Sequence, residues 1–217
     1  MHKATQHIAT EASWRLKSLM RTRRFHSVYS LVRLYKAQVL SFMESSTAAI
    51  AHAAPTLLDA IDSVHRRFLR ELGIDEIDAL REFSLPPLSV RRDISMLGVI
   101  HRSARREGPP QFQRLFPLVS VDRNYWTRTL VRRHHLQVQE RYVFNSTDVI
   151  KRSAFGLVPV YNALPSCVVG LRVRRFQSSL QRAILRRATA HPDSNWSAFL
   201  RLSLREMSVQ MFQVWFT

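Results

Sequence analysis

The chain has 217 residues, 46% of them hydrophobic, with 5 Gly and 9 Pro, which is enough for one domain or two small ones. Its 33 basic and 16 acidic residues give a net charge of +17, and its single cysteine, Cys167, excludes an intrachain disulfide and a Cys-based zinc site. The longest uncharged stretch, residues 153–171, is interrupted by prolines, so no membrane span is expected. We expect a nuclear or cytoplasmic protein that is not secreted and has no membrane partner.

The charge is unevenly distributed along the chain. Residues 1–43 have a net charge of +7, residues 44–90 of −4 and residues 91–217 of +14. Most of the basic residues are Arg, whose planar fork binds phosphate and stacks on bases, so the bias fits a nucleic-acid partner. A GC-rich genome would produce the same bias. Two arrangements are compatible with this pattern. The acidic segment 44–90 neutralises the two basic segments, or the basic segments stay free and line one groove.

Apolar residues recur at steps of three and four through the first half of the chain, which predicts helices. A short amphipathic helix is expected to begin at Trp14 and to end in a basic cluster at residues 21–24. Thr56 and Ser89 fit helix N-caps, and Gly73 fits a C-terminal stop. The expected helices cover residues 14–24, 28–43, 56–72 and 75–81, and a last one begins at Ser89 and is ended by Gly108-Pro109-Pro110.

The second half of the chain is less regular. We expect one turn at residues 112–116, a basic loop or two short strands at 121–148, and an extended segment at 156–165. A strong helix is predicted over 173–188, and an apolar helix over 196–217. The sequence therefore predicts a mainly α fold: a multi-helix, bundle-like body with a less regular, basic C-terminal part that ends in helices. The expected divisions are 1–108, 109–188 and 189–217.

Four short segments stand out in chain order: 34–41 (Leu-Tyr-Lys-Ala-Gln-Val-Leu-Ser), 61–73, 85–93 (Leu-Pro-Pro-Leu-Ser-Val-Arg-Arg-Asp) and 161–165 (Tyr-Asn-Ala-Leu-Pro). Together they resemble the thumb-like region that follows the palm in non-LTR retrotransposon reverse transcriptases. The last segment, followed by Phe176 and Leu180, is similar to that family's closing motif. Tyr161 stands where the family usually has Trp, and Gln177 where it has Lys.

The resemblance implies a fragment of an RNA-directed DNA polymerase that grips nucleic acid without the catalytic palm. The family's palm aspartates hold two metal ions, which require clustered carboxylates. This chain has no Asp-Asp pair, and its only adjacent acidic pair, Asp75-Glu76, is interpreted as a solvated face. We expect no catalytic residue, no metal site and no cofactor in this chain, with Mg²⁺ confined to the missing palm.

Arginines are the candidate residues for contacts with a nucleic-acid backbone. The densest group accompanies the helix predicted over 173–188 and consists of Arg172, Arg174, Arg175, Arg182, Arg186 and Arg187. Arg91 and Arg92 lie in a first helical turn, where their positive charge interacts unfavourably with the helix dipole. Contact with a phosphate would offset this cost. The alternative for this pair is an ion pair with Asp93 or with the acidic middle.

A third group, Arg132-Arg133-His134-His135, follows Tyr125 and Trp126, and this mixture of cations and aromatic rings suits a single strand. The alternative is a disordered basic loop. Three other residues are expected to be structural: Tyr161, Asn162 and Pro165 lock a turn against the core. Cys167 is expected to be a buried small hydrophobe.

The functional hypothesis is that the chain holds a template–primer duplex by its backbone. The expected partners are RNA and DNA, as an RNA–DNA duplex or a single strand, and an upstream polymerase palm. Three alternatives stay open. The chain is a stand-alone basic helical interaction module, a degenerate relic, or a mitochondrial precursor whose residues 1–43 form a transit peptide.

Overall fold

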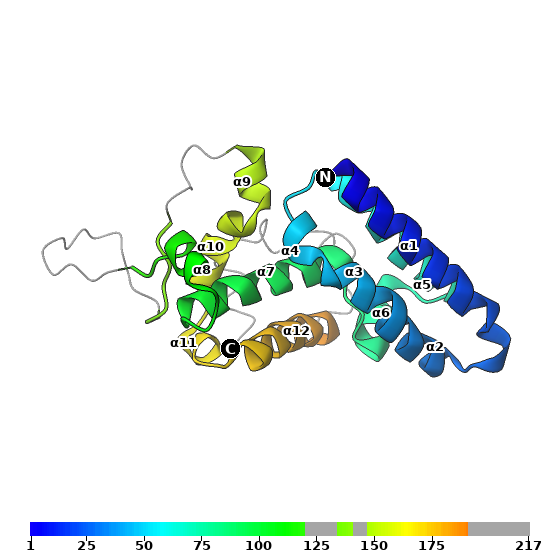
Figure 1. Ribbon diagram of the computed structural model, residues 1–217. Coiled ribbons are helices and arrows are strands. Elements are labelled where there is room, and N and C mark those ends of the chain that lie inside the picture. Colours follow the sequence, from blue (N-terminus) through cyan, green and yellow to red (C-terminus); the bar gives the residue numbers. More distant parts are fainter. Residues whose placement is uncertain (120–133, 141–146, 191–217) are drawn as a thin grey trace, which may run out of the picture. The chain divides into compact units, whose positions relative to one another are not determined.

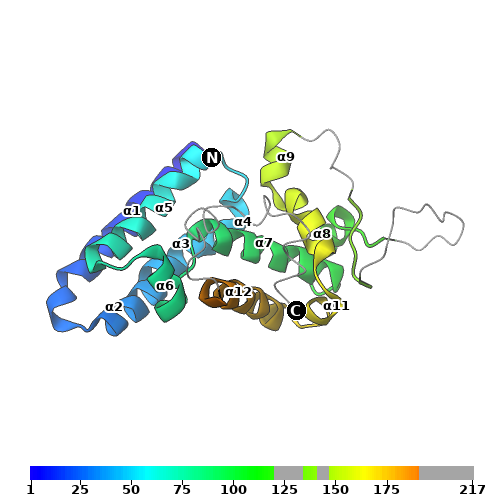
Figure 2. The ribbon, with the colours of Figure 1, turned by 180° about the vertical axis from the view of Figure 1, so that it is seen from behind.

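The structure is a computed structural model that describes residues 1–119, 134–140 and 147–190, excluding the side chains of residues 187, 188 and 190. It confirms a mainly helical fold for the chain (Figures 1 and 2). The described residues form two compact units, unit 1 over residues 1–92 together with residues 188–190, and unit 2 over residues 93–187. The boundary lies inside helix α7 (Leu88–Ala104), before the division expected at residue 108, because the first turn of α7 is ion-paired within unit 1.

Unit 1 is a set of helices around one apolar core. Its elements are α1 (His2–Arg21), the 3₁₀ turn Arg23–Phe25, α2 (Val28–Tyr35), the π-helical turn Lys36–Leu40, α3 (Ser41–Ser45), α4 (Thr47–Ile50), α5 (Pro55–Leu72) and α6 (Glu76–Phe83). Helices α1 and α5 pack along each other (Figures 1 and 2).

Helix α1 is much longer than the sequence predicted, because it begins at His2. Its buried face includes Thr5 and Ala12 as well as larger apolar residues, and these two residues conceal the periodicity in the sequence. Trp14, which the pattern placed on the packed face, is 59% exposed.

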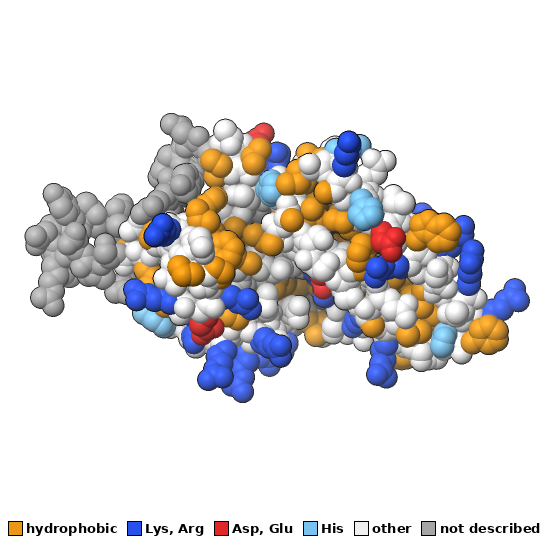
Figure 3. All heavy atoms as spheres, viewed as in Figure 1, with side chains coloured by type: hydrophobic (Ala, Val, Ile, Leu, Met, Phe, Trp, Pro, Cys, Tyr) orange, Lys and Arg blue, Asp and Glu red, His pale blue; other side chains and the backbone are white. Residues whose placement is uncertain are grey.

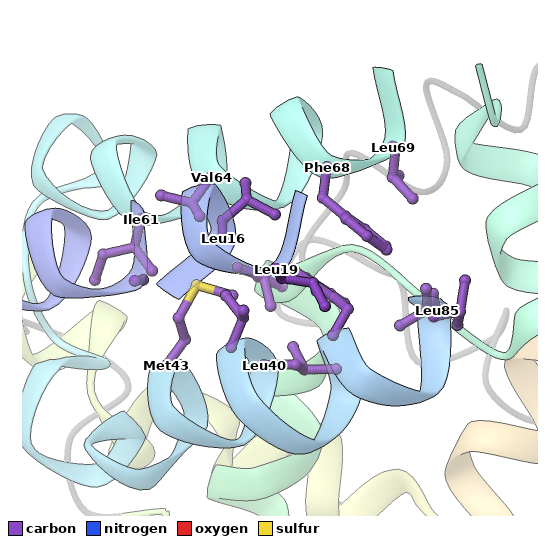
Figure 4. Packing of buried hydrophobic residues seen from close by; sticks show 14 of the residues in the cluster. Leu16, Leu19, Leu40, Met43, Ile61, Val64, Phe68, Leu69 and Leu85 are labelled. Carbon is purple, nitrogen blue, oxygen red and sulfur yellow. The ribbon is translucent and has the colours of Figure 1, made fainter. Parts of the chain in front are cut away.

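The core of unit 1 is formed where α1, α5 and the segment from α2 to α3 meet. Figure 4 shows Leu16 and Leu19 of α1 lying between residues of α5 and residues of the π turn and α3. Phe68 of α5 is fully buried and stacks on Tyr35, with ring centroids 3.8 Å apart and planes 5° apart. Full burial of each such side chain stabilises the fold by about 1.5–3 kcal/mol, so this pair of rings contributes to the packing of α5 on α2.

The π turn Lys36–Leu40 keeps two separate parts of one helix in the same core. Leu31 and Leu40 are nine residues apart, which would place them about 180° apart around a uniform α-helix. Both are nonetheless buried, because the wider π turn between them rotates Leu40 back toward the core. Arg15 donates a hydrogen bond to the carbonyl of Gln38 (3.3 Å), so a carbonyl of this turn is satisfied from α1.

Three helix ends test the predicted caps. Helix α7 begins at Leu88, so the expected N-cap at Ser89 is wrong. Helix α5 begins at Pro55 with Ala54 as its N-cap, so the expected N-cap at Thr56 is wrong. Pro is favoured in the first turn because its fixed φ is helical and its missing N–H has no helical partner there. Gly73 ends α5 with a positive φ of 67°, as its position predicted.

Unit 2 contains the rest of α7, several short helices and the long helix α12. They are α8 (Pro110–Leu115), α9 (Asp148–Arg152), the 3₁₀ turn Ala154–Leu157, α10 (Val158–Ala163), α11 (Ser166–Val169) and α12 (Val173–Ala190). An isolated antiparallel bridge joins Leu118 to Val138.

Two expectations for unit 2 are wrong. Residues 156–165 were expected to be extended, but most of them are helical. Pro159 lies in the first turn of α10, where a helix tolerates it, and most residues of α10 are buried. Cys167 is exposed rather than buried, because the short helix α11 turns Val168 and Val169 toward the core instead.

The expectations for residues 121–133 and 196–217 lie outside the described residues. None of the described helices is both long and apolar enough to cross a membrane.

Candidate nucleic-acid interface

Helix α12 separates apolar and basic residues onto two faces. Its packed face consists of Val173, Phe176, Leu180, Ala183 and Ile184, all buried at steps of one to four residues. The arginines Arg174, Arg175, Arg182 and Arg186 are exposed, as is Arg172 just before the helix. The side chain of Arg187 is not among those described. The sequence therefore predicted both the helix and the exposure of five of the six arginines that accompany it.

Three of these arginines form a line along the helix. Arg175, Arg182 and Arg186 are seven and four residues apart, which is about two turns and one turn on the same side. At a rise of about 1.5 Å per residue their Cα atoms are about 10.5 Å and 6 Å apart along the axis. Successive phosphates of one strand rise about 3.4 Å along the axis of a duplex, so this line is long enough to face several phosphates.

No carboxylate forms an ion pair with these arginines within the part of the chain that the structure describes. Residues 149–192 contain eight basic and no acidic residues. None of the five exposed arginines has an ion pair among the described residues. Figure 3 shows Lys and Arg side chains gathered around α11 and the beginning of α12. A polyanion would offset the mutual repulsion of these charges.

A buried polar cluster fixes the start of α12. His101 of α7 donates from Nε2 to the carbonyl of Leu171 (2.8 Å), and its ring stacks on Phe176 with centroids 4.1 Å apart. Its Nδ1 lies 3.0 Å from the hydroxyl of Tyr161, which donates to it when the ring is neutral. Burial lowers the pKa of His101, which favours this neutral form, and burial raises the pKa of Tyr161. The arginines of α12 thus project from a rigidly held helix.

Asn162 fastens a second segment to the same core. Its side chain accepts from the N–H of Val138 (2.9 Å) and donates to the carbonyl of Val138 (2.8 Å) and to Glu140 (2.9 Å). His134 donates from Nε2 to the carbonyl of Tyr161 (3.2 Å). The expectation that Tyr161 and Asn162 lock the chain against the core is confirmed, although they do so from a helix.

Arg132 and Arg133 directly precede this fastened segment but lie outside the described residues, so the structure does not place them. Tyr125 and Trp126, the aromatic residues expected beside them, also lie outside. His134 is buried and His135 is exposed. Among the described residues, no group of three or more His, Cys, Asp or Glu side chains is arranged to hold a metal ion.

Arg91 and Arg92 are engaged within unit 1. Arg92 donates to both carboxylate oxygens of Asp62 (2.6 and 2.8 Å), and these side chains are 11% and 21% exposed. Arg91 pairs with Glu44. The partners come from the acidic middle of the chain, as one of the two alternatives predicted. A phosphate would have to displace these carboxylates before it could bind either arginine.

Basic residues at the end of α7 were not among the candidates predicted from the sequence. Arg102 and Arg106 are exposed, and Arg105 pairs with Glu107 (2.7 Å). The hydrogen bond from Arg105, together with smaller contributions that include the charge of Arg172, lowers the pKa of Glu107. These residues could have been found in the sequence, because Glu107 is a single acidic residue beside several arginines. The exposed basic surface of unit 2 therefore extends from α12 to the end of α7.

A pocket of about 380 Å³ in unit 2 lies beside these residues. It is lined by Ser103, Ala104, Arg106, Gln113, Phe116, Pro117, Leu118 and Val119. Its described lining contains no Asp, Glu, His or Cys that could act as an acid, base or nucleophile. This lining offers apolar contact and one cation.

Comparison with known proteins gives no family for the chain: no family model, curated protein or solved structure matches it.

Proposed function

We propose that the chain binds the sugar-phosphate backbone of nucleic acid through the basic surface of α12. The observation that supports this most strongly is the line of Arg175, Arg182 and Arg186. These side chains are exposed and form no ion pair within the described residues, on a helix whose other face is held in the core. Arg forks bind phosphate in two-point contacts, and a rigid helix loses little entropy when it does so.

The four-segment resemblance refines this proposal. It suggests that the chain is the thumb-like part of a non-LTR retrotransposon reverse transcriptase and holds an RNA–DNA template–primer duplex. In that arrangement the palm, with its Mg²⁺ ions, lies elsewhere in a longer protein, and this chain by itself has no polymerase activity. Because the helix contacts only phosphates in this proposal, binding should depend little on nucleotide sequence.

The competing function is a helical interaction module whose charge only maintains solubility. A salt titration separates the two, because each phosphate contact releases counterions. The variant for the test is R175Q/R182Q/R186Q, measured by fluorescence anisotropy on a labelled RNA–DNA duplex. The matched control is R66Q/R67Q/R70Q, which removes the same charge from α5, where Arg66 and Arg67 are already paired with Asp59 and Glu71.

For the wild type, log K should fall steeply with log salt concentration. In the α12 variant the slope should decrease by up to about 2.7, or about 0.9 for each lost contact on a B-form duplex. The α5 control should keep a slope close to that of the wild type. Equal slopes for both variants, or no wild-type binding at low salt, would exclude α12 as a backbone-binding surface.

A further inference from the structure

The turn between α1 and α2 projects an aromatic ring into solvent. Phe25 is 84% exposed, the highest value among the large hydrophobic residues described. Arg21, Arg23, Arg24 and His26 surround it in the sequence, and all four are exposed. Figure 3 shows hydrophobic side chains next to Lys or Arg side chains at this end of unit 1. A single exposed ring is ordinary on a protein surface. The ring together with the basic side chains around it makes the turn a candidate binding element.

This turn is held in one conformation by its own hydrogen bonds. The hydroxyl of Thr22 donates to the carbonyl of Leu19 (2.7 Å), and the N–H of Phe25 donates to the carbonyl of Thr22 (2.9 Å). On the other side, the hydroxyl of Ser27 caps α2 by accepting from the N–H of Ser30 (3.3 Å). The ring is therefore presented by a capped turn and not by a loose loop, which reduces the entropy lost on binding.

Other exposed aromatic residues of unit 1 already have neighbours. Tyr29 is 66% exposed, but its ring packs against Phe83 with centroids 5.2 Å apart. Trp14 has the ammonium of Lys17 5.8 Å from its ring centroid. In the described part of the chain Phe25 has no ring partner, and no ion pair is formed by the three arginines near it.

The charge around Phe25 indicates what kind of partner would cover it. No acidic residue occurs between Glu11 and Glu44, so the turn has three unopposed guanidinium groups beside one ring. A nucleotide in a single strand offers the complementary pair of groups, a flat base and a phosphate. A lipid surface offers anions too, but membrane-binding segments need a broad apolar face, and this turn offers one ring among charges.

We infer that residues 21–26 bind unpaired nucleotides, with a base stacked on Phe25 and phosphates held by Arg21, Arg23 and Arg24. This inference shares with the proposed function only the assumption that the partner is nucleic acid. It assigns a second site, which lies in unit 1, whereas α12 lies in unit 2. Stacking does not require a particular base, since every base has a flat face. A single strand should be preferred, because the bases of a duplex are already stacked on one another.

The test compares the full chain with Phe25→Ala, Phe25→Trp and Trp14→Ala on a labelled oligothymidylate single strand. Phe25→Ala should weaken binding by about 5- to 100-fold, and Phe25→Trp should restore it, because a base stacks well on either ring. Trp14→Ala is the matched control, since it removes another exposed aromatic ring from the same unit and should leave affinity unchanged. Circular dichroism should show the same helix content in all four proteins, since both positions are exposed.

The outcomes separate this inference from the proposed function. If the wild type binds and Phe25→Ala binds equally well, the turn is not a binding site, while the proposal for α12 stands. If Phe25→Ala affects binding to vesicles that contain phosphatidylserine but not to the oligonucleotide, the partner is a membrane and the inference is overturned. If the wild type binds no nucleic acid even at low salt, both are overturned.

Discussion

Protonation of one buried histidine should destabilise unit 1 in mild acid. His65 of α5 is 4% exposed, and its Nδ1 lies 2.8 Å from the hydroxyl of Tyr35. Its Nε2 has no hydrogen-bond partner among the described residues. Burial lowers the pKa of His65 to about 4, and the nearby charge of Asp62 offsets only part of this effect. The neutral ring is therefore the form that the core accommodates.

The sign and size of the effect follow from linkage. The pKa of a histidine is near 6.5 in the unfolded chain, so between pH 6.5 and 4 the unfolded state binds a proton that the folded state does not. The stabilisation by neutral His65 is complete above pH 6.5 and decreases as the pH falls. From pH 7.5 to pH 5 the free energy of unfolding should fall by about 2 kcal/mol from this group alone.

The assay is urea unfolding at pH 7.5 and pH 5, followed by circular dichroism at 222 nm, for the wild type and His65→Gln. Glutamine retains polar atoms near Tyr35 but does not titrate, so the loss between the two pH values should shrink by about 2 kcal/mol. His7→Gln, at an exposed position of α1, is the control and should behave like the wild type. An unchanged pH dependence in His65→Gln would refute the assignment of the acid sensitivity to this side chain.

Three further predictions concern ion pairing, a buried amide and a close helix contact, all measured by urea unfolding. Asp62→Asn should lower the free energy of unfolding by about 1–3 kcal/mol, because it leaves the mostly buried guanidinium of Arg92 without its carboxylate. Asp59→Asn, at an exposed ion pair, should lower it by less than about 1 kcal/mol. Equal losses would contradict the difference in burial. Asn162→Ala should lower the free energy of unfolding by about 2–3 kcal/mol, since it leaves the buried N–H and carbonyl of Val138 unpaired. A loss below about 0.5 kcal/mol would mean that these two groups find other partners. Gly98→Ala places a Cβ atom 2.3 Å from Nε2 at the flexible end of Gln177, which has to swing aside. The substitution should therefore stabilise the protein less in the wild type than in a Gln177→Ala background, where the helix propensity of Ala should contribute its full effect of about 0.5–1 kcal/mol. The same effect in both backgrounds would exclude the contact as its cause.

The sequence predicted those helices whose packed faces are made of large apolar residues. Helices α5 and α12 follow the expected ranges closely because Ile61, Phe68, Phe176 and Leu180 recur at helical spacing. The first part of α1 was missed because Thr5 and Ala12 are buried there, and neither residue contributes to a hydrophobic pattern. Periodicity detects large apolar side chains and not burial itself.

The candidate site shows a similar limit. The exposure of Arg175 and Arg182 followed from the helical pattern, because the opposite face was clearly apolar. The partners of Arg91 and Arg92 did not, since Glu44 and Asp62 are 47 and 30 residues away along the chain. Likewise, Phe25 would be assigned to a core by composition alone, and only the position of the turn shows that it faces solvent.

The π turn Lys36–Leu40 has a consequence for how the chain tolerates a change in length. A π turn corresponds to an α-helix with one additional residue. Removing Ala37 or Gln38, both exposed, would leave eight residues from Leu31 to Leu40, about 80° apart on a regular helix and still on one side. Removing a residue from a helix without such a turn would instead rotate everything beyond it by about 100°. A chain that lacks one residue in this turn should therefore fold around the same core.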